Sequence, residues 1–276
     1  MTRHSTYRTL GAAGLVLGAG LVWTRDMSWI DKSADMLPLA AGFQLAAWLG
    51  GPWQMSEDSQ SDHPSLAWPI LAGLVFAVAW ILPSLTLLAL SWTALAAYWM
   101  RRWCQPQTNI IGLLLILALS FPWMVIEWPQ IGWWFRLSAA ASVEGFFNLL
   151  QMPVERHGTE LLVLGESIHI EPACAGWNML QLTLLAGAAI GVHDISKRPR
   201  FLIFLLLLPA LAWLANFLRI LLLSALSLTF GLATAEGVWH GMTGLLVIAV
   251  VLGMAKLLCR ALDPDGPVTI RRSHSQ

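Results

Sequence analysis

Long stretches that are almost free of charge constrain this chain more than any other feature. Several run for about 17 to 25 residues, long enough for a helix to cross roughly 30 Å of hydrocarbon. Only 12% of the 276 residues are charged and 57% are hydrophobic, whereas a soluble domain has about 25% charged residues. The sequence therefore predicts an all-α polytopic membrane protein.

The apolar stretches predict about eight transmembrane helices. They cover residues 9–23, 35–50, 66–82, 84–101, 109–128, 174–192, 201–225 and 237–259. Pro83 separates the third helix from the fourth, because proline cannot continue the helical hydrogen-bond ladder. One long kinked helix over residues 66–101 is the alternative.

The basic residues indicate the orientation, because loops rich in Lys and Arg stay in the cytoplasm. With the N-terminus inside, ten basic residues fall on the cytoplasmic side and four on the outer side. The ten are Arg3, Arg8, Arg101, Arg102, Lys197, Arg198, Arg200, Arg260, Arg271 and Arg272, and the four are Arg25, Lys32, Arg136 and Arg156. We therefore expect a multi-pass protein of the cytoplasmic membrane with both termini inside. Lys256 lies within a helix, and its side chain is expected to reach toward the cytoplasm.

Residues 129–173 form the longest segment predicted outside the membrane, on the outer face. Within it, FRLSAAASVEGFFNLL (135–150) is typical of a small amphipathic or re-entrant helix. Two short strands are then predicted around His157-Gly158 and Gly165-Glu166. Pro172 ends this strand-like segment, and Cys174 begins the sixth helix.

Three chemically useful residues are predicted at one depth, near the outer boundary of the membrane. Arg219 follows Phe201 by 18 residues, which is about 27 Å of helix. His240 precedes Cys259 by 19 residues, and Cys174 precedes His193 by 19, about 28 Å in each case. A charge inside a membrane helix is costly, so Arg219 in particular suggests function.

Each of the three helices also carries a polar stripe. The members lie three, four or seven residues after the first of each stripe: Cys174, Asn178 and Gln181; Asn216 and Arg219; and His240, Thr243 and Gly244. Residues at these spacings share one face of a helix. Three adjacent polar stripes are hard to place facing lipid, so they indicate a shared polar cleft.

Acyl transfer through a thioester suits such a cleft. The Cys174 thiolate is the nucleophile, and His240 takes the thiol proton and returns it to the leaving amine. Arg219 holds the substrate carbonyl or stabilises the oxyanion. Asn216 and Asn178 are assigned to orienting these groups or binding substrate, and Glu171 to orienting His240. No metal-ligand spacing and no nucleotide motif is present, so we expect neither metal nor cofactor.

Each residue also has an ordinary structural explanation. A cysteine in an apolar helix usually serves as a small hydrophobic residue. An arginine near a helix end often extends its charge to the interface, and a histidine beside a tryptophan is typical of the membrane boundary. It is the agreement in depth across three helices that favours a site.

In their order along the chain, ACAGWNML (173–180), NFLRI (216–220) and WHGMTG (239–244) resemble the exosortase/archaeosortase family of integral-membrane cysteine transpeptidases. The likeness extends loosely over residues 131–259. It implies Cys174 as nucleophile, with Arg219 and His240 as the other catalytic residues and Asn216 as the asparagine before the arginine. Family members usually have Cys-Ser-Gly or Cys-Thr-Gly followed by an aliphatic residue, and this chain differs at Ala175 and Trp177.

The resemblance implies an enzyme that cleaves C-terminal sorting signals of exported proteins at the outer face of the membrane. Such a signal has a short motif (Pro-Glu-Pro in the bacterial type), a hydrophobic helix and a basic tail. A lipid or polysaccharide is the implied acceptor, and water is the alternative. The chain would then comprise N-terminal transmembrane helices (1–128), an exosortase-like catalytic region (129–260) and a cytoplasmic tail (261–276).

A non-enzymatic transporter or membrane scaffold is the alternative from another class, with Arg219 and the polar stripes lining a solute path. A transporter should tolerate Cys174→Ala but not the loss of Arg219, whereas an acyl-transfer enzyme should lose activity with either change. Because the formal net charge is zero, no long-range field favours a nucleic-acid partner. The expected partners are the lipid bilayer and membrane-inserted protein substrates.

Overall fold

The computed structural model describes most of the chain, in two compact units. The described residues are 3–28, 37–51, 53–55, 65–105, 109–152, 154–163, 166–169, 177–231 and 238–264. The first unit is Met1–Glu127 and the second is Trp128–Gln276. Whether they correspond to separate functions stays a prediction.

The first unit consists mainly of helices. Its elements are α1 (Arg3–Arg25), α3 (Leu37–Leu49), β1 (Gln54–Met55), α4 (Ala67–Ile81), α5 (Leu85–Trp103), β2 (Cys104–Gln105), α6 (Ile110–Leu119) and α7 (Trp123–Glu127). The two short strands pair antiparallel, with Gln54 opposite Gln105 and Met55 opposite Cys104. Helices α1 and α5 pack closely because Gly11 and Gly18 leave room for Trp99 and Trp92.

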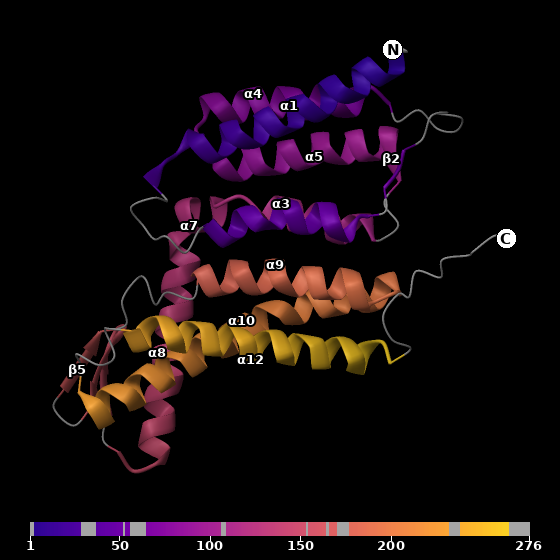
Figure 1. The fold of residues 1–276 in the computed structure, drawn as a ribbon. Helices are drawn as coiled ribbons and strands as arrows, with labels where there is room; N and C mark the ends of the chain where they lie inside the picture. Colours follow the sequence, from indigo (N-terminus) through magenta and orange to yellow (C-terminus); the bar gives the residue numbers. More distant parts are fainter. Residues whose placement is uncertain are drawn as a thin grey trace. The chain divides into compact units, whose positions relative to one another are not determined.

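The break at Pro83 separates two helices that pack side by side (Figure 1). The expected alternative of one kinked helix over residues 66–101 is therefore wrong. The Ser84 hydroxyl accepts a hydrogen bond from the backbone N–H of Leu87. The Glu127 carboxylate accepts hydrogen bonds from the backbone N–H groups of Leu85 and of Thr86, the latter at 2.9 Å. These contacts satisfy the free donors at the start of α5 and place a negative charge where the helix dipole favours it.

The described residues of the second unit form four helices and a small sheet. Its elements are α8 (Pro129–Leu149), β3 (Val154–His157), β4 (Glu160–Val163), β5 (Glu166–His169), α9 (Trp177–Asp194), α10 (Arg198–Phe230) and α12 (Val238–Leu262). Strands β3, β4 and β5 form an antiparallel sheet in that order. The sequence predicted two strands, which is wrong in number. Gly158, with φ of +67°, turns the chain between β3 and β4, so what looked like one strand is a hairpin.

Helix α8 is longer and more deeply packed than the surface helix expected over residues 135–150. It begins at Pro129, a residue suited to the first turn of a helix. Its residues Ala139, Ala140 and Val143 are fully buried and form one core with α10 and with β3 and β4. The small sheet and α8 thus cover the part of α10 that follows Arg219.

Two described helices are long and apolar enough to cross a membrane by themselves, Arg198–Phe230 and Met242–Leu262. Shorter apolar helices occur at Leu39–Leu49, Ala67–Ile81 and Ile110–Leu119. Eight crossings, their orientation and the kind of membrane therefore stay predictions. With 33 residues, α10 measures about 50 Å, longer than the predicted crossing at 201–225, and its last turns lie against α8 and the sheet.

Candidate functional site

The structure describes the predicted site residues to different extents. Cys174 and Glu171 lie outside the described residues. Asn178 and His240 lie in the first turns of α9 and α12, where the structure describes the backbone. For Asn216 and Arg219, both in α10, the side chains are described as well, and both are buried.

Arg219 is enclosed between helices. Its residue is 8% exposed, and a Cβ built on Gly244 of α12 would lie 3.7 Å from the Cζ and Nη2 atoms of the guanidinium. The guanidinium therefore lies beside α12 at Gly244, where a side chain larger than that of alanine would reach it. The neighbouring Thr243 is also buried. This environment excludes the explanation in which Arg219 simply extends into water.

The pairing of α10 with α12 brings His240 close to Arg219 along the bundle. The two helices run antiparallel, since Ala215 packs with Val247 and Val251 farther along α12. His240 precedes Gly244 by four residues and shares its helix face. About 6 Å of helix, slightly more than one turn, therefore separates the backbone of His240 from the position that contacts Arg219.

The pairing of α9 with α10 brings the start of α9 to the same level. Gly187 lies against Leu208, and Gly191 lies against Phe204. The two helices are therefore antiparallel, and a step along α9 matches an equal step back along α10. Asn178, nine residues before Gly187, is then level with Phe217, nine residues after Leu208. The described chain re-enters the bundle at Trp177, three residues after Cys174, close to the level of Arg219.

Two further polar residues lie deep between these helices. Gln181 of α9 is fully buried, one turn after Asn178. Asn216 is also fully buried, and its Nδ2 donates a hydrogen bond of 3.4 Å to the carbonyl of Phe135 in α8. The Oδ1 atom of Asn216 has no hydrogen-bond partner among the described residues. Asn216 therefore ties α10 to α8.

One neighbouring contact was not apparent from the sequence. Trp213 Nε1 donates a hydrogen bond of 3.0 Å to the Ser138 hydroxyl, a second link between α10 and α8. Trp213 precedes Asn216 by three residues and so lies on the same face of α10. The sequence offered one signal for this contact: Trp213 and Asn216 are two hydrogen-bonding residues on one helix face in an otherwise apolar run.

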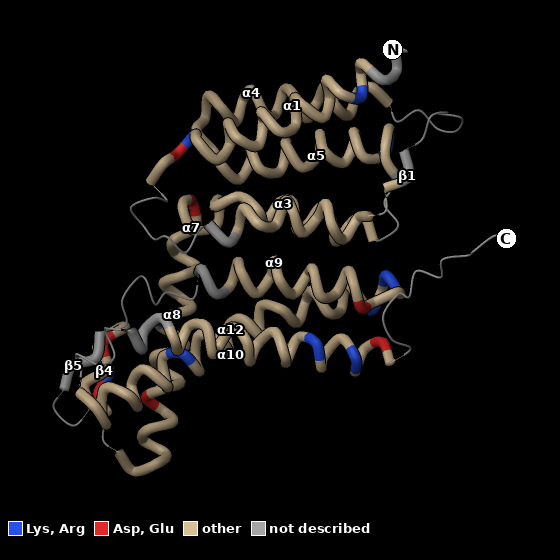
Figure 2. The backbone as a smooth tube through the Cα atoms, in the orientation of Figure 1, with Lys and Arg blue, Asp and Glu red and all other residues tan. Residues whose placement is uncertain are grey.

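Charged residues gather at the end of the α9, α10 and α12 bundle that lies away from Arg219 (Figure 2). Among the described residues of these helices, Arg219 is the only charged one away from that end. Lys256 Nζ lies 2.5 Å from Asp194 Oδ2, and His193 Nδ1 lies 2.8 Å from Asp194 Oδ1. A carboxylate on the adjacent helix therefore binds Lys256, and whether this end faces the cytoplasm stays a prediction.

A second cluster closes the same end. The Asp263 carboxylate accepts hydrogen bonds of 2.9 Å from both the backbone N–H and the hydroxyl of Ser196, and one of 2.6 Å from Arg200 Nη1. The hydrogen bonds from Ser196, with the Arg200 charge nearby, hold the pKa of Asp263 below its usual value. Asp263 follows α12 directly, so this cluster joins the end of α12 to the turn between α9 and α10.

The comparisons with known proteins bear on this geometry. The sequence model of the transmembrane exosortase family matches residues 2–256. The chain belongs to the transmembrane exosortase family. The match runs through both units and includes Cys174, Arg219 and His240. The search of curated proteins and the search of solved structures gave no match. Family membership supports a membrane-embedded, cysteine-type sorting enzyme that acts on membrane-bound proteins carrying sorting signals.

Proposed function

We propose that this exosortase-family protein is a cysteine transpeptidase or protease that cleaves C-terminal sorting signals at the outer face of the cytoplasmic membrane. The observation that carries the proposal is the buried Arg219. Its guanidinium lies against Gly244, one turn from His240, at the level where the chain enters α9 just after Cys174. Burying a fixed positive charge inside an apolar bundle costs free energy, so its presence points to a function.

The reaction would proceed through a thioester. The Cys174 thiolate attacks the carbonyl carbon of the scissile peptide bond after His240 takes the thiol proton. Arg219 stabilises the negative charge that develops on the carbonyl oxygen. The C–N bond then breaks, and His240 returns the proton to the departing amine. Attack by an acceptor, either water or a group on a lipid or polysaccharide, releases the substrate and regenerates the thiol.

The polar groups around these three residues have supporting roles in the proposal. Asn216 positions α10 on α8 through the Phe135 carbonyl, and its Oδ1 can accept a hydrogen bond from the N–H of the substrate peptide. Asn178 shares the face of α9 with buried Gln181 and orients the nucleophile or substrate, and Glu171 orients His240. The substrate class is a membrane-inserted protein with a short motif of the Pro-Glu-Pro type, a hydrophobic helix and a basic tail.

The decisive experiment co-expresses such a protein with the wild-type enzyme or with Cys174→Ser, and analyses the C-terminus of the product by mass spectrometry. We expect a shorter product that depends on Cys174, and any added mass identifies the acceptor. Cys259→Ala is a matched control, because Cys259 is a buried free cysteine on α12 and should leave processing unchanged. Processing that persists in Cys174→Ser would refute the nucleophile.

Arg219→Lys and Arg219→Gln separate charge from geometry. Arg219→Gln removes the positive charge, and we expect processing to fall by 10²- to 10³-fold, about the effect of losing one oxyanion donor. Arg219→Lys keeps the charge but lacks the planar fork of donors, so it should recover part of the activity. If the protein's function in the cell is lost with Arg219→Gln but kept with Cys174→Ala, the transporter is favoured instead.

A further inference from the structure

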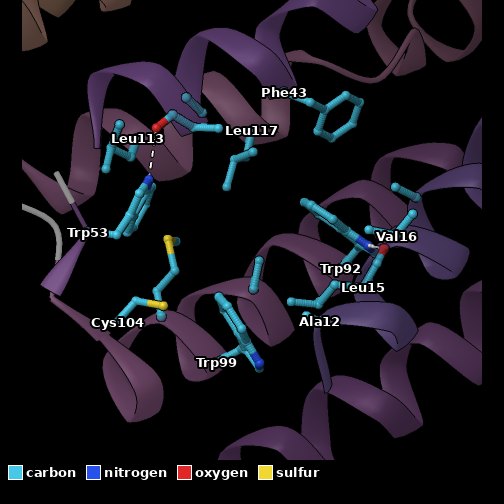
Figure 3. A pocket seen from close by; sticks show the side chains of 15 residues that line it. Ala12, Leu15, Val16, Phe43, Trp53, Trp92, Trp99, Cys104, Leu113 and Leu117 are labelled. Atoms are coloured by element: carbon cyan, nitrogen blue, oxygen red, sulfur yellow. Dashed lines mark hydrogen bonds between the residues drawn. The ribbon is translucent and has the colours of Figure 1, made fainter. Parts of the chain in front are cut away.

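An apolar cavity of about 540 Å³ lies within the first unit, lined by residues of α1, α3, α5 and α6 (Figure 3). Trp53, Trp92 and Trp99 form its walls, alanines such as Ala12 widen it, and Met100 and Cys104 close one end. Pockets that bind small molecules usually measure roughly 300 to 1,000 Å³. None of the candidate catalytic residues lines this cavity, so it needs an explanation of its own.

The hydrogen-bond donors of the three tryptophans are already used. Trp53 Nε1 donates to the Ala47 carbonyl at 2.8 Å, and Trp92 Nε1 donates to the Leu15 carbonyl at 2.9 Å (dashed lines in Figure 3). Trp99 Nε1 donates to the Arg8 carbonyl at 3.3 Å. The indole N–H groups therefore offer nothing to a polar ligand. An apolar cavity of only about 150 Å³ can stay dry and bind hydrocarbon, so this larger one suits a hydrocarbon occupant.

The cavity is open to the surface beside α1. Val16 lines it and is 73% exposed, as are other apolar residues along α1 such as Leu17. In a membrane protein this surface meets lipid tails. A flexible hydrocarbon chain can therefore enter from the side without leaving the apolar phase.

Positive charges lie at the end of the cavity that Met100 and Cys104 close. Arg101 directly follows Met100 in the last turn of α5 and is exposed. Arg8 approaches from α1, where its carbonyl receives the Trp99 N–H. Its charge is near enough to lower the pKa of the Cys104 thiol, although burial raises that pKa by more. An apolar cavity with cationic residues near one end matches a molecule that has a hydrocarbon chain and an anionic head.

We propose that this cavity binds one acyl chain of an anionic phospholipid, with the net negative charge of the headgroup beside Arg8 and Arg101. The inference goes beyond the proposed peptide cleavage and does not depend on it, because no residue is shared between the two sites. Basic residues beside a membrane attract anionic lipids. The arginines lie on the side predicted to be cytoplasmic, so the lipid belongs to the inner leaflet.

Native mass spectrometry of the full chain in detergent tests the proposal. Dioleoyl phosphatidylglycerol is titrated into the delipidated protein. Phosphatidylcholine with the same acyl chains, whose headgroup has no net charge, serves as the comparison. We expect one phosphatidylglycerol to be retained under conditions that strip phosphatidylcholine. Arg8→Gln and Arg101→Gln should each weaken retention by about fivefold, the effect of one basic residue at a membrane surface. Arg260→Gln, on α12, is the matched control.

Filling the cavity tests the acyl-chain site. Ala12→Leu places about three more carbons in the space that the chain would occupy and should weaken retention by about tenfold or more. Ala13→Leu is the matched control, since Ala13 is the next residue of α1, is exposed, and does not line the cavity. Melting temperatures verify that each variant is folded. Equal retention by Ala12→Leu and wild type would overturn the acyl-chain site, and equal retention of both lipids would overturn the role of the arginines.

Discussion

Gly244 offers the sharpest test of whether Arg219 must keep its position. A Cβ on Gly244 would lie 3.7 Å from the guanidinium of Arg219, an ordinary contact distance. Gly244→Ala therefore requires no movement of the arginine. Because glycine is a poor residue inside a helix, this change should raise the free energy of unfolding by about 0.5–1 kcal/mol. Processing of the sorting signal should stay near the wild-type rate.

Gly244→Leu should behave differently. Leucine extends three carbons beyond a Cβ that is already in contact with the guanidinium, so Arg219 must move by about an ångström or more. Overpacking of this kind costs about 1–3 kcal/mol of stability. A misplacement of about 1 Å in a catalytic group can cost on the order of 100-fold in rate. We therefore expect processing to fall about 100-fold in a protein that still folds.

The assay follows the processed fraction over time by gel and mass spectrometry, with enzyme amounts matched and melting temperatures recorded. Gly253→Leu is the matched control, because a Cβ at Gly253 on the same helix meets nothing within 4 Å. It should process the substrate at the wild-type rate. If Gly244→Leu does so too, the position of Arg219 does not matter for activity and the argument fails.

Two other predictions concern stability. The pKa of Asp263 is lowered in the folded state, so its stabilising contribution is present above the unfolded pKa of about 3.9 and is lost as pH falls through the folded pKa. Asp263→Asn should therefore flatten the decline in melting temperature that wild type shows below about pH 5. Glu127→Gln keeps the shape of the cap on α5 but removes its charge, which should lower the free energy of unfolding by about 0.5–1 kcal/mol, measured by denaturant titration in detergent.

The sequence predicts the helices well and their ends less well. Long apolar runs identify helices, because the signal extends over many residues. The run at 109–128, expected as one helix, is instead two, α6 (Ile110–Leu119) and α7 (Trp123–Glu127). The ends depend on single contacts: α10 continues to Phe230 because α8 and the sheet cover its last turns. The hairpin of β3 and β4 looked like one strand, since its turn depends on the positive φ of Gly158 alone.

The candidate site was predicted from the depth of three residues in the membrane. Depth gives a position along each helix but not the direction in which the side chain points. The burial of Arg219 against Gly244 depends on how α10 and α12 are rotated, which the spacing of polar residues indicated but did not fix. The link from Asn216 to Phe135 was not predictable, because a backbone carbonyl of another helix has no sequence signal. The pairing of Lys256 with Asp194 was missed because Asp194 was assigned to a loop.

The two ends of α9, α10 and α12 should therefore be separable by mutation. Lys256 lies 12 residues after Gly244, about 18 Å along α12, and pairs with a buried Asp194 while remaining 43% exposed itself. Solvent screening places the cost of Lys256→Met between that of a surface pair and a buried pair, about 1–2 kcal/mol. Asp194→Asn/Lys256→Met should recover part of this loss, because the buried carboxylate is removed together with its lysine partner. Since Gly187 and Gly191 still fix the packing of α9 on α10, folded Lys256→Met should process substrate at the wild-type rate. A loss of activity with unchanged melting would mean that the charged end controls the site directly.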